Sequence, residues 1–239
     1  MKGGNMSKAA KCFQGGGFGS PPLAAVAVLA ALALAIAPGR AEGVSVITNG
    51  SFESGYNPPT GTFRTLQAGT ADADDIDGWL VTANSVDWIC TYWQAAHGVR
   101  SLDMSGTAAG TIVTATIFST IPGEPYLVEF YMSGNPDGTR GVKTLKVIAQ
   151  TGSSTYEQTF TYDTLAKGNT RTDMKWELQS WYFTAQGATT TLGFASLTST
   201  AYGPALDNVS VELVPEPLTL AGVLLGVGCA AGYVRRRRG

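Results

Sequence analysis

The chain has 239 residues, of which 14% are charged and 10% aromatic, and its formal net charge is −2. Charged residues normally make up roughly a quarter of a soluble chain, so this composition excludes a disordered, highly charged protein and a coiled coil. Both ends are basic, and residues 42–214 hold 8 basic and 17 acidic side chains, a formal charge of −9. A surface of that charge repels a phosphate backbone, so we expect no binding to nucleic acid.

Residues 1–41 have the pattern of a secretory signal peptide. Three lysines precede an uncharged run over 23–37, and the small residues Gly39 and Ala41 stand where a cleavage site needs them. The apolar run is shorter than the stretch of about 20 residues that crosses a membrane as a helix. We therefore expect a signal helix that is removed on export, with cleavage after Ala41, rather than a permanent anchor.

The last segment, 215–239, consists of a Pro-Glu-Pro, an uncharged apolar stretch over 218–234 and a cluster of arginines before the final glycine. A helix over 218–234 would be about 25 Å long, slightly short of a hydrocarbon core of about 30 Å. The arginines would hold the end of this helix on the cytoplasmic side. The order of these parts predicts a C-terminal transmembrane helix.

The same three parts resemble the bacterial PEP-CTERM sorting signal. The resemblance implies a transient anchor in the inner membrane of a Gram-negative bacterium that exports polysaccharide. It also implies that an exosortase, a membrane cysteine protease, cuts near the Pro-Glu-Pro. We then expect the mature protein at the cell surface or in the extracellular matrix. The residues that carry the resemblance are Pro215, Glu216, Pro217, Arg235, Arg236, Arg237 and Arg238.

Residues 42–214 have the alternation of an all-β domain. Short β-branched and aromatic runs switch between drier and wetter positions, turn clusters separate them, and no stretch keeps a helical period. About ten short strands without helices between them predict two packed antiparallel sheets, and a jelly-roll β-sandwich is the first choice. The expected strands are Val44–Ile47, Trp79–Thr82, Val86–Ile89, Thr111–Phe118, Tyr126–Met132, Thr144–Ala149, Tyr156–Tyr162, Ser180–Ala185, Thr189–Leu197 and Val209–Leu213.

Six short segments of this domain carry a family resemblance. They are NGSFE (49–53), DGW (77–79), VDW (86–88), GVRSLDMSG (98–106), YLVEFYMSGNPDG (126–138) and GPALDNVSV (203–211). In this order they resemble the bacterial choice-of-anchor C family, which is related to a domain-of-unknown-function family of plant cell-wall proteins. The resemblance implies a galactose-binding-like jelly roll, a fold shared with many carbohydrate-binding modules. The plant relatives usually carry cysteines, whereas Cys90 stands alone in 42–214, so no disulfide can form there; we expect it to be a small buried residue.

Little in the sequence supports catalysis. The one histidine, His97, excludes a metal site built of several histidines, and no serine lies in a G-x-S-x-G motif. Two acids from distant strands could form a glycosidase pair, but their spacing singles out no pair. We therefore expect a protein that is not an enzyme and keep a glycan hydrolase as the third alternative.

Two groups of acids are candidates for a cation site. The acidic loop 72–77 fails the EF-hand pattern, because position 6 holds Asp77 instead of glycine and position 12 holds Ala83, so only a cation site of another kind stays open there. Glu53 and Asp207 are the better pair, since the resemblance places the first and last strands side by side and hard oxygen ligands suit Ca²⁺. We predict a structural Ca²⁺ at this pair. The alternative is that both carboxylates only accept hydrogen bonds from turn amides.

The aromatic residues divide into core and surface candidates. Tyr92, Trp93 and Gln94 fall between a strand and a loop, so we expect an exposed platform on which rings stack against a sugar while Gln94 holds its hydroxyls. This favours an exported, non-enzymatic surface or matrix protein that binds polysaccharide. The alternative is a structural or adhesive matrix protein that contacts other proteins. The rings expected in the core are those of Trp79, Trp88 and Trp181.

Overall fold

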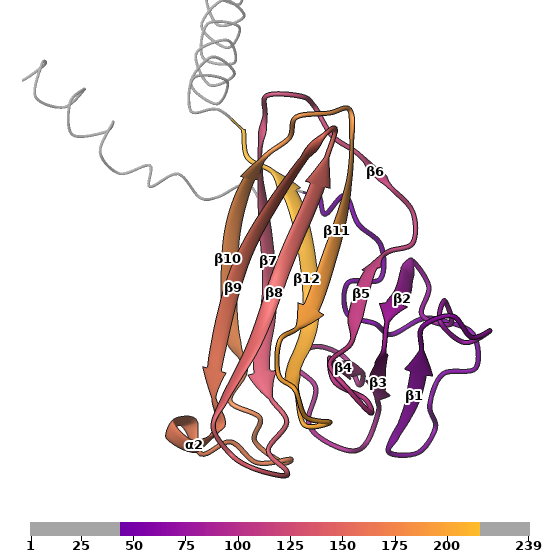
Figure 1. Ribbon diagram of the computed structural model, residues 1–239, viewed down its shortest axis with the longest axis vertical. Coiled ribbons are helices and arrows are strands. Elements are labelled where there is room, and N and C mark those ends of the chain that lie inside the picture. Colours follow the sequence, from indigo (N-terminus) through magenta and orange to yellow (C-terminus); the bar gives the residue numbers. More distant parts are fainter. Residues whose placement is uncertain (1–43, 216–239) are drawn as a thin grey trace, which may run out of the picture. The chain divides into compact units, whose positions relative to one another are not determined.

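The computed structural model describes residues 44–215, which form two antiparallel β-sheets packed against each other (Figure 1). The expected signal helix and C-terminal transmembrane helix lie outside these residues. Across 44–215 no helix has the length and apolar character needed to cross a membrane. The prediction of an all-β, antiparallel sandwich of the jelly-roll type is confirmed.

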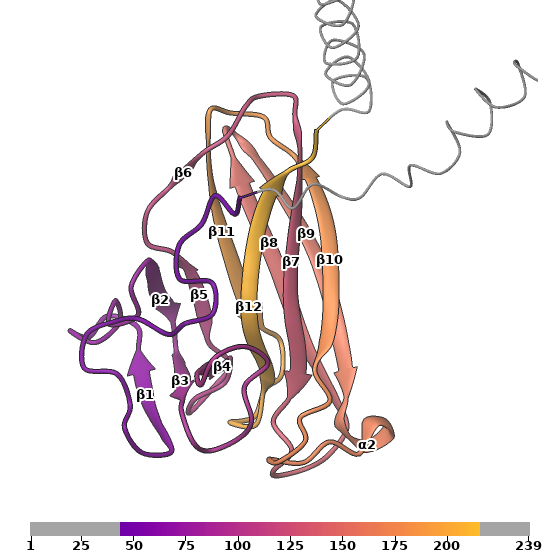
Figure 2. The same cartoon turned by 180° about the vertical axis from the view of Figure 1, so that it is seen from behind.

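Each sheet joins strands that are distant in sequence. The first has the order β1 (Phe63–Gln67), β3 (Ser85–Ile89), β4 (Ser101–Asp103), β12 (Pro204–Leu213), β7 (Pro125–Gly134) and β10 (Glu177–Thr184). The second has the order β2 (Trp79–Ala83), β5 (Thr111–Thr114), β11 (Thr189–Ser196), β8 (Val142–Thr151) and β9 (Ser154–Asp163), and β6 (Phe118–Ser119) pairs with β11. Figure 2, from behind, shows β12, β7 and β10 side by side in front of the second sheet.

The core lies between the sheets and is rich in aromatic rings. Trp79 and Trp88 are 1% and 0% exposed, as expected, and Trp181 is partly buried against the same cluster. Both buried indoles also find hydrogen-bond partners: Trp79 Nε1 donates to the carbonyl oxygen of Asn49 at 3.0 Å, and Trp88 Nε1 to that of Phe52 at 2.8 Å. These bonds tie the segment before β1 to the core, because a buried indole N–H is costly without an acceptor.

The N-terminal segment runs beside the last strand. Val46 N donates to Val211 O at 2.8 Å, and Val209 N donates to Gly50 O at the same distance. The expected strand over 44–47 is therefore not a regular strand, but its neighbourhood to β12 is confirmed. β12 bulges here, since its register shifts between Asp207 and Ser210.

This close approach gives a prediction at Gly50. An added Cβ there would collide with the carbonyl oxygen of Val209, whereas at Gly61 it would meet nothing within 4 Å. Gly50→Ala should therefore lower the free energy of unfolding by about 1–3 kcal/mol through overpacking. Gly61→Ala should leave it within about 0.5 kcal/mol, or raise it slightly. Urea titration of the two variants measures the difference, and equal midpoints would contradict the packing of this segment on β12.

Four loops gather at one end of the sandwich, beside the one-turn helix α2 (Thr164–Lys167) (Figure 1). Asp163 begins this turn by accepting hydrogen bonds from Leu165 N and Ala166 N, and Gly168 ends it with a φ of 62°. The loops are residues 90–100, 135–141, 168–176 and 197–203, which follow β3, β7, α2 and β11 respectively.

Candidate functional site

The four loops bring together a set of aromatic and charged side chains that we call the loop-end cluster. Gln94 N donates to Arg171 O, and Asn135 N to Gly203 O, each at 2.9 Å, so backbone bonds join the loops in pairs. A Cβ on Gly138 would collide with the ring of Tyr202, which shows how closely these two loops pack. The cluster consists of Tyr92, Asp137, Arg171, Trp176 and Tyr202.

The polar centre of the cluster is a closed triangle of side chains. Asp137 Oδ2 accepts from the Tyr92 hydroxyl at 2.6 Å and from Arg171 Nε at 2.9 Å, and Arg171 Nη2 donates to the Tyr92 hydroxyl oxygen at 2.7 Å. The Arg171 guanidinium also lies over the Tyr92 ring, 4.1 Å from its centroid. The side chain of Arg171 is 50% exposed and that of Asp137 is 29% exposed, so solvent reaches this ion pair.

The triangle keeps Tyr92 protonated. Burial and the hydrogen bond to Asp137 raise the pKa of Tyr92 to about 12. The hydroxyl therefore remains a donor at neutral pH. Because Tyr92 and the guanidinium hold the carboxylate in place, the cluster presents a fixed acceptor and fixed donors toward solvent.

Half-exposed rings surround the triangle. Phe63 is 42% exposed and meets Tyr92 edge to face, with ring centroids 5.3 Å apart. Tyr202 is 40% exposed, and Trp176 is partly buried with its Nε1 donating to Gln94 O at 2.9 Å. Charged hydrogen-bonding groups and ring surface therefore occur together at this end of the domain.

The expected exposed platform is wrong at Trp93. Its side chain is 4% exposed, packs with Ile89, Met174 and Ala205, and donates from Nε1 to Ser101 Oγ at 2.8 Å. The outer face of the first sheet carries small or apolar residues here, and the loop folds the indole down onto them. Tyr92, by contrast, is half-buried and belongs to the loop-end cluster, and Gln94 is exposed beside it, where its backbone oxygen accepts from Trp176 Nε1.

Sequence reasoning singled out neither Arg171 nor Tyr202 nor Asp137 as a site residue. Arg171 lies 79 residues from Tyr92 in the chain, and no local motif links them. The sequence did contain one signal, the glycine at 138 that follows Asp137. Gly138 has a φ of 64°, which marks a tight turn that presents the Asp137 carboxylate.

Glu53 and Asp207 both accept hydrogen bonds from backbone amides of the same loop, residues 90–100. Glu53 Oε1 accepts from Val99 N at 2.9 Å and Arg100 N at 2.8 Å, and Asp207 Oδ2 accepts from Ala96 N at 2.8 Å and His97 N at 2.9 Å. Asp207 Oδ1 also accepts from Asn208 N at 2.6 Å. Burial raises the pKa of Asp207 to about 7, while its three N–H donors favour the charged form.

This donor set does not fit a calcium ion. The Arg100 guanidinium lies 3.5 Å from Glu53 Oε2, and loop amides occupy the other carboxylate oxygens that a cation would need. Among the described residues no group of three or more His, Cys, Asp or Glu side chains converges as a metal site. In the acidic loop 72–77, the Asp75 carboxylate forms an ion pair with the Arg64 guanidinium. The arrangement matches the alternative of carboxylates bound to turn amides, and calcium stays an untested prediction.

Two further candidate residues lie apart from these groups. His97 is an exposed loop residue, and its backbone N–H donates to Asp207 Oδ2. Cys90 is half-buried rather than fully buried.

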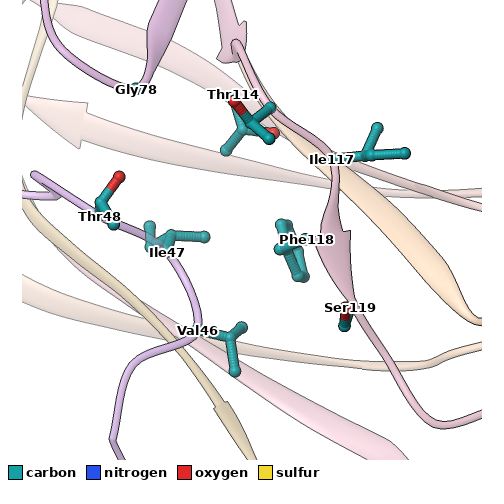
Figure 3. A pocket seen from close by; sticks show the side chains of 9 residues that line it. Val46, Ile47, Thr48, Gly78, Thr114, Ile117, Phe118 and Ser119 are labelled. Atoms are coloured by element: carbon teal, nitrogen blue, oxygen red, sulfur yellow. The ribbon is translucent and has the colours of Figure 1, made fainter.

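A shallow hollow of about 410 Å³ opens on another part of the domain (Figure 3). It contains no charged side chain and no exposed aromatic ring, since Phe118 is 7% exposed. Its polar side chains are the hydroxyls of threonine and serine, and it offers a sugar neither a charged group nor an exposed ring, so the loop-end cluster is the better candidate. The hollow is lined by Val46, Ile47, Thr48, Gly78, Thr114, Thr116, Ile117, Phe118 and Ser119.

The chain belongs to the family described as Protein of unknown function (DUF642), whose sequence profile matches residues 45–212. It is also similar to Halomucin from Haloquadratum walsbyi, with 28% identity over 192 residues; the match covers 79% of this chain and 2% of Halomucin. The expected relation to a domain-of-unknown-function family is thus confirmed. The choice-of-anchor C resemblance and the sorting signal stay predictions.

Several solved structures are similar to this chain at low sequence identity. A CBM61 in complex with β-1,4-galactotriose is 13% identical, with a TM-score of 0.44, over 72% of this chain and 99% of that one. The CBM22-1 xylan-binding domain from Paenibacillus barcinonensis is 18% identical, with a TM-score of 0.41, over 65% and 97%. A family 35 carbohydrate-binding module from Clostridium thermocellum is 12% identical, with a TM-score of 0.38, over 63% and 98%.

Proposed function

We propose that this domain is a non-enzymatic module that binds polysaccharide at the loop-end cluster. The observation that carries the proposal is the solvent-exposed Asp137–Arg171 pair, fixed by Tyr92 and bordered by half-exposed rings. A carbohydrate needs both kinds of group. Its adjacent hydroxyls form paired hydrogen bonds with carboxylate and guanidinium, and its C–H faces pack on aromatic rings.

The arrangement favours binding over hydrolysis. Asp137 is the one carboxylate of the triangle, and Arg171 neutralises it. Hydrolysis of a glycosidic bond uses two carboxyl groups on opposite sides of the bond, one of them a proton donor. The triangle therefore offers a recognition surface in which each polar group is already oriented.

Arg171→Ala tests the proposal. It removes the guanidinium from a half-exposed position, so it should weaken binding at least tenfold, or about 1.4 kcal/mol, while leaving the fold intact. The measurement is titration of the full chain with a panel of neutral and acidic polysaccharides, where we expect dissociation constants of roughly 10 μM to 1 mM.

The matched control is Lys146→Ala. Lys146 forms a comparable surface ion pair with Glu157, at 3.0 Å, between β8 and β9 of the other sheet. This variant should bind like the parent. If Arg171→Ala also binds every glycan like the parent, the loop-end cluster is not the site, and release of reducing ends during the titration would restore the glycan hydrolase.

One observation favours the second candidate function, an adhesive domain that contacts proteins. Leu178 and Tyr182 of β10 lie on the same side of this edge strand and are 54% and 59% exposed. Exposed apolar side chains on a sheet face suit a protein partner better than a sugar. Loss of a binding partner in Tyr182→Ala, with glycan binding unchanged, would support this alternative.

The proposed place of action follows from the two ends of the chain. The signal segment 1–41 and nearly all of the tail 215–239 lie outside the described residues. Export, a transient anchor and cutting by an exosortase-type protease therefore remain proposals that rest on the sequence patterns alone.

A further inference from the structure

β10 is an edge strand whose outer margin is open. It lies at the end of the first sheet and, among the described residues, pairs only with β7. Figure 2 shows β10 at the margin of this sheet, with β7 next to it. A strand in this position presents a row of backbone N–H and C=O groups to which another strand can pair.

The backbone groups of β10 that face outward follow from its contacts with the neighbouring strand. Ala185 N, just after β10, donates at 3.0 Å to the carbonyl oxygen of Glu124, just before β7, so the Ala185 amide faces β7. Successive residues of a strand direct their backbone groups to opposite margins. The N–H and C=O groups of Leu178, Ser180 and Tyr182 therefore face the open margin.

β10 lacks the features that usually protect an edge strand, which are charged side chains, proline and β-bulges. The run 178–184 contains no charged residue and no proline, and its register with β7 does not shift. Other edges of the two sheets are protected. β9 carries Glu157 and β1 carries Arg64, while the register of β2 shifts between Val81 and Ala83.

The exposed side chains of β10 are suited to a protein partner. Leu178 and Tyr182, 54% and 59% exposed, lie on the face of the sheet that is turned away from the core. Their partners in register are Tyr131 and Leu127 of β7, so apolar side chains continue from the open margin onto the sheet. Apolar surface beside unpaired backbone groups favours the addition of another strand.

The sequence of β10 is complementary to itself. When two copies of the strand run antiparallel about a two-fold axis at Ser180, Leu178 lies opposite the partner's Tyr182, and Ser180 lies opposite the partner's Ser180. These are the residues whose backbone groups face the open margin, so each pair would exchange two N–H···O bonds. The two Leu–Tyr pairs would cover apolar surface on both sides of the axis.

The distribution of charge also favours this margin for a second copy. Residues 42–214 have a formal charge of −9, so two copies of the domain repel each other over much of their surface. Pairing along the uncharged run 178–184 sets no like charges opposite each other.

We propose that two copies of this chain pair antiparallel through β10 and join their first sheets into one continuous sheet. The pairing does not depend on glycan binding. The loop before β10 contributes Trp176 to the loop-end cluster, so antiparallel pairing places the two clusters at opposite ends of the joined sheet. As a consequence that rests on the proposed function, the dimer would cross-link polysaccharide chains.

Sedimentation velocity of the full chain, in a mild detergent and without glycan, tests the pairing. The parent should dimerise with a dissociation constant of roughly 1–100 μM. Ser180→Asp sets two carboxylates opposite each other, beside Glu129 of β7, and should weaken the dimer at least about tenfold. Ser180 is exposed, so this charge should leave the fold intact. A parent that is monomeric throughout this range overturns the proposal.

A charge exchange tests the position of the two-fold axis. A residue on the axis faces only its own counterpart, so mixing Ser180→Asp with Ser180→Lys should restore a dimer. Thr159→Asp is the matched control, because it adds the same charge at an exposed position of β9, and this variant should dimerise like the parent. A dimer that Ser180→Asp leaves unchanged, or a mixture that stays monomeric, overturns the pairing through β10.

Turbidity of a polysaccharide solution tests the cross-linking separately. The parent should cross-link the polysaccharide, Ser180→Asp should bind it without cross-linking, and Arg171→Ala should dimerise without binding it. A parent that dimerises and binds polysaccharide but does not cross-link it overturns this consequence. A parent that dimerises but binds no polysaccharide supports the pairing and overturns the proposed function instead.

Discussion

Trp93→Ala is expected to lower the free energy of unfolding by about 3–5 kcal/mol, the range for truncating a buried aromatic side chain. The ring is 4% exposed and packs on Ile89, Met174 and Ala205. Its removal leaves a cavity on the outer face of the first sheet. It also leaves the hydroxyl of Ser101, which is 0% exposed, without the indole N–H that now binds it.

Urea titration of the full chain measures this loss, and two further variants interpret it. Trp93→Phe keeps most of the ring but not the hydrogen bond, so it should cost about 1–3 kcal/mol. Gln94→Ala changes the exposed neighbour and should stay within about 0.5 kcal/mol. A Trp93→Ala variant as stable as the parent, with reduced glycan binding, would instead restore the exposed platform that the sequence predicts.

The strands that could be predicted are those with several buried residues in alternation. In β8, residues Lys143, Leu145 and Val147 are all buried, and the expected segment 144–149 falls within this strand. β1 and β4 were not predicted for physical reasons. Only Leu66 of β1 is buried, and β4 has three residues, too few to show a period of two.

Part of the candidate site could also be predicted. The pairing of the first segment with β12 brings Glu53 and Asp207 to the same loop, as expected from the resemblance. Turn amides were one of the two alternatives for this pair, but the particular loop could not be predicted. No spacing in the sequence places the amides of residues 96–100 and the Arg100 guanidinium beside these carboxylates.

The rest of the site depends on contacts between distant loops. Tyr92 and Trp93 have the same local sequence context, yet one ring turns toward Arg171 and the other toward Ala205. The buried ring, that of Trp93, packs on the small side chain of Ala205 in β12. Ala205 comes more than a hundred residues later in the chain. Periodicity within a segment carries no information about that surface.

The stability of the domain should fall as the pH rises from about 5 to about 8, by about 6 kcal/mol in total, with the larger share from Asp103. Burial raises the pKa of Asp103 from 3.8 to about 8, and burial raises that of Asp207 to about 7. At a pH between 3.8 and these raised pKa values, the folded chain keeps protons on the two carboxyl groups that the unfolded chain has already lost. Folding is then favoured by acid, and the effect ends above the folded pKa values, where both states are ionised.

Asp103→Asn isolates the contribution of Asp103 to this pH dependence, which is larger than that of Asp207. An asparagine cannot ionise, so this variant should show a shallower decline between pH 5 and pH 8, whatever its stability at pH 5. Asp173→Asn is the control. Asp173 is exposed, and its hydrogen bond with Lys175 lowers its pKa, so this carboxyl group titrates below pH 5 in both the folded and the unfolded state. Its replacement should leave the slope of stability against pH unchanged. Urea titrations at a series of pH values measure both slopes.

A parent protein whose stability rises steadily from pH 5 to pH 8 would mean that Asp103 ionises readily in the folded state. The three hydrogen bonds that its carboxylate accepts would then outweigh its burial.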